Sequence, residues 1–164
     1  MTRTIYLIRH AEAATKKPIQ TDLQRELTPT GKQDAQMAGV YLKSKSVIFD
    51  LVLCSLAVRT HTTAQLITIN MSDPSTDVII EPSIYHATDD DLFTILCNVP
   101  ISKKSVALVG HNPAISWFAS SLTKSKIETF DPCTMAAFQF DVEKWADLRL
   151  QTGCLEFIHS PSIF

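Results

Sequence analysis

Arginine and histidine side chains stand directly after three apolar runs of the sequence. Arg9 and His10 follow the run TIYLI. Arg59 comes shortly after LVLC, and His111 with Asn112 follows VALVG. An arginine keeps its proton in a protein, and its planar guanidinium can bind two oxygens of one phosphate. Two arginines and two histidines at one place would therefore favour a multiply charged anion, of which phosphate is the commonest in biology.

Two histidines beside a phosphate would also permit a reaction. A neutral imidazole can attack phosphorus, while a second, protonated imidazole can stabilise charge on the transferring group or pass on a proton. Such chemistry needs no metal and no cofactor. The four glycines of the chain form neither a GxGxxG nor a P-loop pattern, so any phosphate must be bound by side chains.

The elements that must position these side chains alternate between strands and helices. Apolar, β-branched segments predict strands at residues 4–9, 49–55, 78–82, 105–109, 134–140 and 154–158. Helices are predicted to begin at Pro29 after the cap residue Thr28, at residue 57 with Ser55 as its cap, near 89–91 and at Pro113. This alternation predicts an α/β fold, a three-layer α/β/α sandwich with a mainly parallel central sheet. In such sheets, functional groups gather beyond the carboxyl ends of the strands.

The composition is that of an ordinary globular domain. The chain has 164 residues, 45% hydrophobic and 20% charged, and we expect one domain over residues 1–164. A net charge of −2 without a basic block argues against nucleic acid as a partner, and no apolar stretch approaches the roughly 20 residues of a membrane span. The N-terminus does not resemble a signal peptide and the cysteines form no CxxC pair, so we predict mostly buried free thiols and a cytoplasmic protein.

Six segments, in this order, resemble one known family: LIRHAEAA, RELTPTGKQDAQMAGVYL, LVLCSLAVRTHTTAQLI, SIYHA, VALVGHNPAIS and TMAAFQF. They are similar to the histidine phosphatase superfamily, which has the phosphoglycerate-mutase-like fold, and within it to the small SixA-type phosphohistidine phosphatases. The resemblance covers nearly the whole chain. It implies that His10 is the nucleophile and that Arg9, Arg59 and His111 are catalytic residues that bind the phosphate. Asn112 is a further phosphate ligand on the same grounds.

The sequence departs from the family pattern at two points. Arg-His-Gly reads Arg-His-Ala here, and because alanine is small we expect activity to survive with Ala11. Many members carry an acidic proton donor in the region that reads EPSIYHATDDD here, where Glu81 and Asp89 to Asp91 are the candidates. An ester leaving group usually needs such an acid, whereas imidazole leaves more easily because its nitrogen protonates near neutral pH. The second departure therefore favours phosphohistidine as the substrate.

The leading hypothesis is a metal-independent phosphatase that acts through a phosphohistidine intermediate on His10. Its expected substrate is a phosphohistidine-bearing protein, because the short connections predict an open pocket. One alternative is a small-molecule or general phosphomonoesterase of the same superfamily. A second is a hydrolase in which His10, Glu12 and His111 bind zinc, and a third is a non-catalytic module that binds a phosphorylated partner. The sequence does not determine the oligomeric state.

Overall fold

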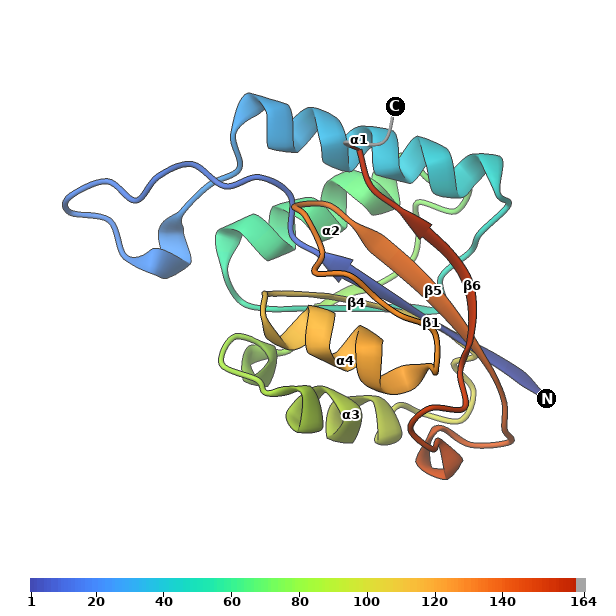
Figure 1. Cartoon of the computed structure of the whole chain (residues 1–164). Coiled ribbons are helices and arrows are strands. Elements are labelled where there is room, and N and C mark those ends of the chain that lie inside the picture. Colours follow the sequence, from blue (N-terminus) through green and yellow to red (C-terminus); the bar gives the residue numbers. More distant parts are fainter. Residues whose placement is uncertain (162–164) are drawn as a thin grey trace.

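The computed structural model describes residues 1–161, and a six-stranded sheet lies at its centre (Figure 1). The strands are β1 (Thr2–Arg9), β2 (Leu51–Cys54), β3 (Val78–Ile80), β4 (Ser105–Gly110), β5 (Met135–Asp141) and β6 (Cys154–His159). Their order across the sheet is β3-β2-β4-β1-β5-β6. The strands from β3 to β1 are parallel to their neighbours, whereas β5 is antiparallel to both β1 and β6. The predicted α/β fold with a mainly parallel sheet is confirmed.

In the described part of the chain, four α-helices cover the two faces of this sheet. Figure 1 shows α1 (Pro29–Ser44) and α2 (Val58–Ile69) on one face, and α3 (Asp89–Cys97) and α4 (Ala114–Leu122) on the other. α1 begins as predicted, because the hydroxyl of Thr28 accepts the amide hydrogen of Gly31 at 2.9 Å. This bond satisfies a backbone donor that has no partner within the helix. The result is the predicted three-layer sandwich.

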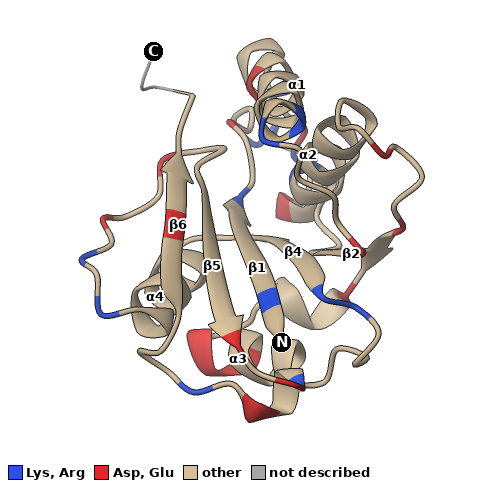
Figure 2. Ribbon diagram, turned by 90° about the vertical axis from the view of Figure 1, so that its right-hand side faces the viewer, with Lys and Arg blue, Asp and Glu red and all other residues tan. Residues whose placement is uncertain are grey.

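β1 is buried on both faces, which explains its unbroken apolar sequence. Ile5 and Leu7 belong to the core on the side of α3 and α4, whereas Tyr6 and Ile8 belong to the core on the side of α1 and α2. Successive side chains of a strand point to opposite faces, so both parities must be apolar here. Figure 2 shows that charged residues lie mainly in the loops and on the helices. A central strand packed on both faces is a rigid support for the residues at its end.

Two details correct the predictions. The N-cap of α2 is Ala57 rather than Ser55, because the chain turns for two more residues before the helix begins. The buried Ser55 hydroxyl instead accepts the Ala57 amide hydrogen at 3.3 Å. The cysteines are free as predicted, but only Cys54 and Cys133 are buried. Cys97 is half-buried at the end of α3, and Cys154 is exposed at the start of the edge strand β6.

Two further predictions concern the whole chain. No helix among residues 1–161 is long and apolar enough to cross a bilayer. The predicted domain of residues 1–164 includes residues 162–164, which lie outside the described residues.

Candidate active site

A polar pocket of about 350 Å³ opens beyond the carboxyl ends of β1, β2 and β4. It is lined by nine residues: Arg9, His10, Asp22, Arg25, Arg59, Tyr85, His86, His111 and Asn112. The structure thus brings together all five predicted site residues, although they come from three separate parts of the chain. Parallel strands end at the same edge of a sheet, so residues that directly follow them become neighbours.

The backbone around His10 is fixed from three directions. Its amide hydrogen bonds the carbonyl of Gly110 at 3.1 Å, and its own carbonyl accepts the amide hydrogen of Cys133 at 3.0 Å. The next amide hydrogen, that of Ala11, bonds the hydroxyl of Thr63 on α2 at 3.0 Å. Hydrogen bonds to β4, to the segment before β5 and to α2 therefore fix the backbone that carries the imidazole of His10.

Ala11, the departure from the family pattern, fits its position. It is fully buried in the core beneath α1 and α2. Among residues 1–161, positive φ angles outside glycine occur only at Ser46, Cys133 and Gln151. Because Ala11 does not need the left-handed conformation that favours glycine, an alanine satisfies the backbone here.

The hydrogen bonding of His10 determines which ring nitrogen can attack. Its Nδ1 lies 2.7 Å from the carbonyl oxygen of Ala11. A carbonyl oxygen only accepts, so Nδ1 must carry the proton and Nε2 keeps its lone pair. Burial lowers the pKa of His10 to about 4, with Arg59 and Arg9 acting in the same direction. The imidazole is therefore neutral at pH 7, as a nucleophile requires.

His111 is the second imidazole of the pocket, and its ring centroid is 5.4 Å from that of His10. Its Nε2 is 2.8 Å from the hydroxyl of Ser55, and its Nδ1 is 3.4 Å from Nη2 of Arg59. A guanidinium only donates, so Nδ1 carries the lone pair and Nε2–H donates to Ser55. Burial, and after it the proximity of His10 and Arg59, lowers the pKa of His111 to about 3. The second imidazole, which we expected to be protonated, is thus neutral at pH 7 in this structure.

The two arginines present unused donors to the pocket. Nη1 of Arg9 donates to the carbonyl of Phe130 at 2.7 Å. The Nε atoms of both Arg9 and Arg59 are buried and have no hydrogen-bond partner. A buried donor without a partner costs about 1–3 kcal/mol, and more on a charged group. Two positive guanidinium groups in one pocket, of which that of Arg9 gives one N–H to a protein acceptor, make the site suited to phosphate.

Asn112 lies in the pocket, but its amide already has protein partners. Nδ2 donates to the carbonyl of Phe130 at 2.9 Å, and Oδ1 accepts the hydroxyl hydrogen of Ser116 at 2.6 Å. One hydrogen of Nδ2 stays available to a ligand. The predicted role of Asn112 as a phosphate ligand stays a prediction.

The carboxylate of the pocket belongs to Asp22, which the sequence analysis did not single out. Its Oδ2 accepts from Nη2 of Arg59 at 2.9 Å and from the hydroxyl of Tyr85 at 2.5 Å. Its Oδ1 accepts from Nη1 of Arg25 at 3.2 Å, and its backbone carbonyl accepts from Nη1 of Arg59 at 2.8 Å. These donors, that of Tyr85 foremost, hold the pKa of Asp22 well below its usual range. Asp22 is therefore an anion at the mouth of the pocket.

The acidic residues proposed from the sequence lie elsewhere. Glu81 accepts from the amide and the hydroxyl of Ser83, and Asp91 closes the capping box of α3 with Thr88. Neither these residues nor Asp89 and Asp90 line the pocket of His10. The reason is that the chain after β3 turns into a short 3-10 helix that brings Tyr85 and His86, not a carboxylate, to the pocket.

The zinc alternative places Glu12 beside the histidines. In the structure, the Glu12 carboxylate accepts the hydroxyl hydrogen of Thr28 at 2.9 Å, and Glu12 does not line their pocket. Among residues 1–161, no three His, Cys, Asp or Glu side chains form a group that could hold a metal ion.

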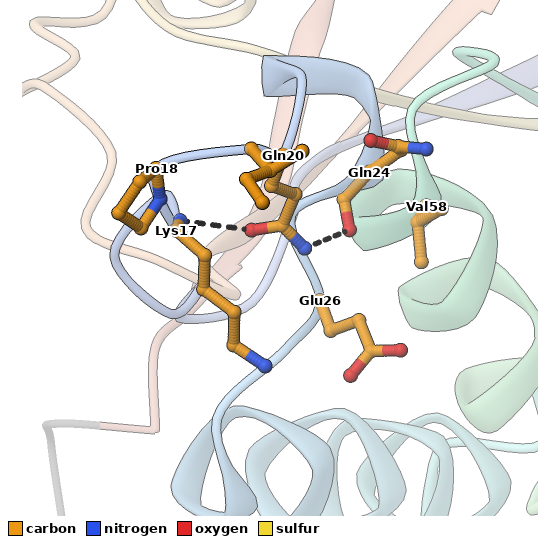
Figure 3. A pocket seen from close by; sticks show the side chains of 7 residues that line it. Lys17, Pro18, Gln20, Gln24, Glu26 and Val58 are labelled. Atoms are coloured by element: carbon orange, nitrogen blue, oxygen red, sulfur yellow. Dashed lines mark hydrogen bonds between the residues drawn. The ribbon is translucent and has the colours of Figure 1, made fainter.

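A second hollow lies on the other side of the segment that carries Asp22 and Arg25. Figure 3 shows it between the loop at Lys17 and the start of α2. The side chain of Gln20 holds the loop, because it accepts the Lys17 amide hydrogen at 3.1 Å and donates to the Gln24 carbonyl at 2.8 Å. Ile19 on this loop is fully exposed. The groove is lined by Lys17, Pro18, Ile19, Gln20, Gln24, Glu26 and Val58.

Comparison with known proteins agrees with this geometry. The sequence profile of the histidine phosphatase superfamily (branch 1) matches residues 5–84, which include Arg9, His10 and Arg59. An uncharacterised protein of Mycobacterium leprae (strain TN) is 26% identical over 165 residues, which cover 94% of this chain and 99% of that protein.

Solved structures match over nearly the whole chain. A candidate phosphohistidine phosphatase SixA from Nakamurella multipartitia superposes with a TM-score of 0.85 at 28% identity, covering 98% of this chain and 97% of the other. The protein histidine phosphatase SixA in complex with tungstate has the same fold, with a TM-score of 0.77, 20% identity and 97% of both chains covered. The chain is therefore similar to the histidine phosphatase superfamily, both in the profile match over residues 5–84 and in the fold of nearly its whole length. Its fold is that of the SixA structures, of which the Nakamurella multipartitia protein is the one with 28% identity.

Proposed function

We propose that the protein is a phosphohistidine phosphatase that carries the phosphoryl group on Nε2 of His10 during the reaction. The observation that carries this proposal is the 2.7 Å contact between Nδ1 of His10 and the carbonyl oxygen of Ala11. The Nδ1–H group is bound to the Ala11 carbonyl, which leaves the Nε2 lone pair free in a pocket with two arginines. The guanidinium groups of Arg9 and Arg59, which line the same pocket, are the donors for the phosphoryl oxygens.

The reaction has two steps. In the first, the Nε2 lone pair of His10 attacks phosphorus, the bond from phosphorus to the leaving group breaks, and its electron pair goes to that group. In the second, water attacks the phosphoryl group and the electron pair of the P–N bond returns to Nε2. His10 then leaves as a neutral imidazole, since Nδ1–H stays with the Ala11 carbonyl. One proton of the water remains on the phosphate and the other passes to solvent or to His111.

His111 stabilises the phosphoryl group in this scheme. Its Nδ1 carries the lone pair of the ring, and a proton taken up there would be donated to an oxygen of the bound group. The negative charge of a phosphate favours that protonation, whereas burial, His10 and Arg59 lower the pKa of the ring. The Ser55 hydroxyl keeps Nε2–H bound throughout.

A protein is the substrate that suits the surroundings of the pocket. The pocket is open on one side, and the exposed Ile19 and the groove at Val58 lie just across the segment of Asp22 and Arg25. A polypeptide that presents a phosphohistidine to His10 would cover this groove. The SixA proteins with the same fold are described as phosphohistidine or protein histidine phosphatases. Action in the cytoplasm, and action without a metal, are part of the same proposal.

Trapping the intermediate tests this function. The protein is mixed with phosphohistidine labelled in its phosphoryl group, quenched in alkali within milliseconds to seconds, and digested for mass spectrometry. We expect the label on the peptide that contains His10 and none in the His10→Gln variant. His61→Gln is the matched control, because His61 lies on α2 and does not line the pocket.

The same assay separates the alternatives. A zinc hydrolase would lose activity in chelator, whereas the proposed reaction continues in chelator and is inhibited by vanadate. A non-catalytic module would bind phosphate without turnover, and a phosphomonoesterase would hydrolyse phosphoserine peptides faster than phosphohistidine. Full activity of His10→Gln would disprove the covalent mechanism.

A further inference from the structure

The Asp22 carboxylate lines the same pocket as His10, Arg9, Arg59 and His111, and 44% of its side chain is exposed. Nη2 of Arg59 connects it to the second histidine, because this atom donates to Oδ2 of Asp22 at 2.9 Å and lies 3.4 Å from Nδ1 of His111. In an in-line displacement, the leaving group departs on the side opposite the nucleophile. An anion in the same pocket must favour some leaving groups over others.

An ionised carboxylate there selects against an alkoxide and for an imidazole. The departing oxygen of a phosphomonoester gains negative charge, which a carboxylate repels. An imidazole ring bears a second nitrogen, and this nitrogen carries a proton when phosphohistidine is in its reactive form. Asp22 could accept a hydrogen bond from this N–H group. Its two carboxylate oxygens offer about four acceptor positions, and Arg25, Arg59 and Tyr85 use three of them.

We propose that Asp22 is a specificity-determining residue, whose carboxylate binds the distal ring N–H of a substrate phosphohistidine and so favours P–N over P–O cleavage. The inference rests on the proposed function and adds the residue that recognises the leaving group. In this step, Nε2 of His10 forms a bond to phosphorus and the P–N bond of the substrate breaks. The electron pair of the broken bond stays on the departing nitrogen. Because the distal nitrogen already carries the proton, a neutral imidazole departs and no general acid is required.

The same kind of hydrogen bond would hold both imidazole rings, that of His10 and that of the substrate. The Ala11 carbonyl binds Nδ1–H of His10 and leaves Nε2 as the reacting nitrogen. Asp22 would bind the corresponding N–H of the substrate ring and leave the other nitrogen attached to phosphorus. The depressed pKa of Asp22 agrees with this role, since an acid that stays ionised accepts a hydrogen bond and does not supply a proton. Its anchors are Arg59, Arg25 and Tyr85.

The test compares two substrates in one variant. Asp22→Asn keeps the size of the side chain and removes its charge. The values of kcat/KM for free phosphohistidine and for an aryl phosphate are measured in wild type and variant. We expect the value for phosphohistidine to fall about tenfold or more, and the value for the aryl phosphate to stay the same or rise. Asp90→Asn, at the exposed start of α3, is the control and should leave both values unchanged.

Three other outcomes would each overturn the proposal. An equal fall for both substrates would mean that Asp22 only positions Arg59. An equal rise would mean that the carboxylate competes with phosphate for the arginines. A larger fall for the aryl phosphate would make Asp22 a general acid.

Further measurements distinguish the proposed role of the Asp22 charge from a structural effect of the substitution and from a failure of the proposed function. Tyr85→Phe removes one hydrogen bond from Asp22 but leaves the carboxylate, so the substrate ratio should stay near that of wild type. A ratio that changes as much as in Asp22→Asn would contradict the role of the charge. Thermal unfolding and the affinity for inorganic phosphate show whether each variant is folded. If the wild-type protein does not hydrolyse phosphohistidine at all, the proposed function fails before Asp22 is tested.

Discussion

The hydroxyl of Ser55 lies 2.8 Å from Nε2 of His111, and this contact joins the end of β2 to the end of β4 inside the pocket. Ser55 also accepts the Ala57 amide hydrogen at the start of α2. Its oxygen therefore fixes both the orientation of the imidazole and the entry to the helix that carries Arg59. A short polar side chain, fully buried, connects two of the predicted site residues.

Ser55→Ala should reduce turnover and lower stability moderately. The change removes an acceptor for Nε2–H of His111, so the ring loses its fixed orientation and an unpaired buried donor remains. The unpaired donor costs about 1–3 kcal/mol of stability, and we expect the loss of the fixed ring orientation to lower kcat/KM for an aryl phosphate about tenfold. Ser120→Ala on α4, where the hydroxyl bonds only its own helix, is the control and should behave as wild type. An unchanged kcat/KM in Ser55→Ala would show that His111 does not depend on this bond.

The two pocket histidines should make the protein less stable in mild acid. Their pKa values in the folded protein are about 4 for His10 and about 3 for His111, below the value of about 6.5 in the unfolded chain. Between these limits the unfolded chain binds more protons, so the free energy of unfolding falls as the pH is lowered from 6.5 toward 4. The slope is at most about 1.4 kcal/mol per pH unit for each histidine, and solvent screening of the half-buried rings reduces it.

Urea unfolding at pH 7 and pH 5 measures this slope. The double variant His10→Gln, His111→Gln should lose less stability than wild type over the same interval. His61→Gln, outside the pocket, should keep the wild-type difference. Parallel losses in wild type and in the double variant would show that the pocket histidines are not the groups responsible.

The groove at Ile19 should matter for a protein substrate and not for a small one. Ile19→Asp places a charge on a fully exposed apolar side chain. If the substrate protein covers this groove, the loss of about 1 kcal/mol of apolar burial should lower kcat/KM for a protein-borne phosphohistidine about fivefold or more. The value for free phosphohistidine should not change. Ile101→Asp is the matched control, because Ile101 is also exposed but lies near the opposite ends of the strands, where its carbonyl binds Arg3. Equal effects on both substrates would exclude a docking role.

The strands and most of the pocket could be predicted because their signals are local. The apolar run before Arg9 defines β1, and Pro29 after Thr28 defines the start of α1. Once the sheet is parallel, its topology brings Arg59 and His111 to the same edge. These predictions needed only the order of the elements and not the detailed path of a loop.

Asp22 could not be predicted because its position depends on contacts far along the chain. It lies in a polar segment without periodicity, and Arg59 and Tyr85 hold it from 37 and 63 residues away. The spacing of Asp22 and Arg25 is a signal for an ion pair, but not for a place in the pocket. The prediction that an acidic residue after β3 lies in the pocket was wrong for the same reason. The carboxylate of the pocket comes from the segment after β1 instead.

Gly31 should be a sensitive position of α1, because the helix there approaches the segment that follows His10. A Cβ atom at Gly31 would lie 2.2 Å from the carbonyl oxygen of Glu12, a backbone atom that cannot move alone. Gly31→Ala should therefore cost about 1–3 kcal/mol of stability, typical of an overpacked site. It should also lower kcat, since Glu12 and His10 share one short backbone segment. Gly110→Ala is the control for stability: the nearest atoms to its Cβ are 3.4 Å away, so its free energy of unfolding should change by less than about 1 kcal/mol. Equal stability losses in the two variants, measured by urea unfolding, would show that the approach of α1 to Glu12 does not restrict residue 31.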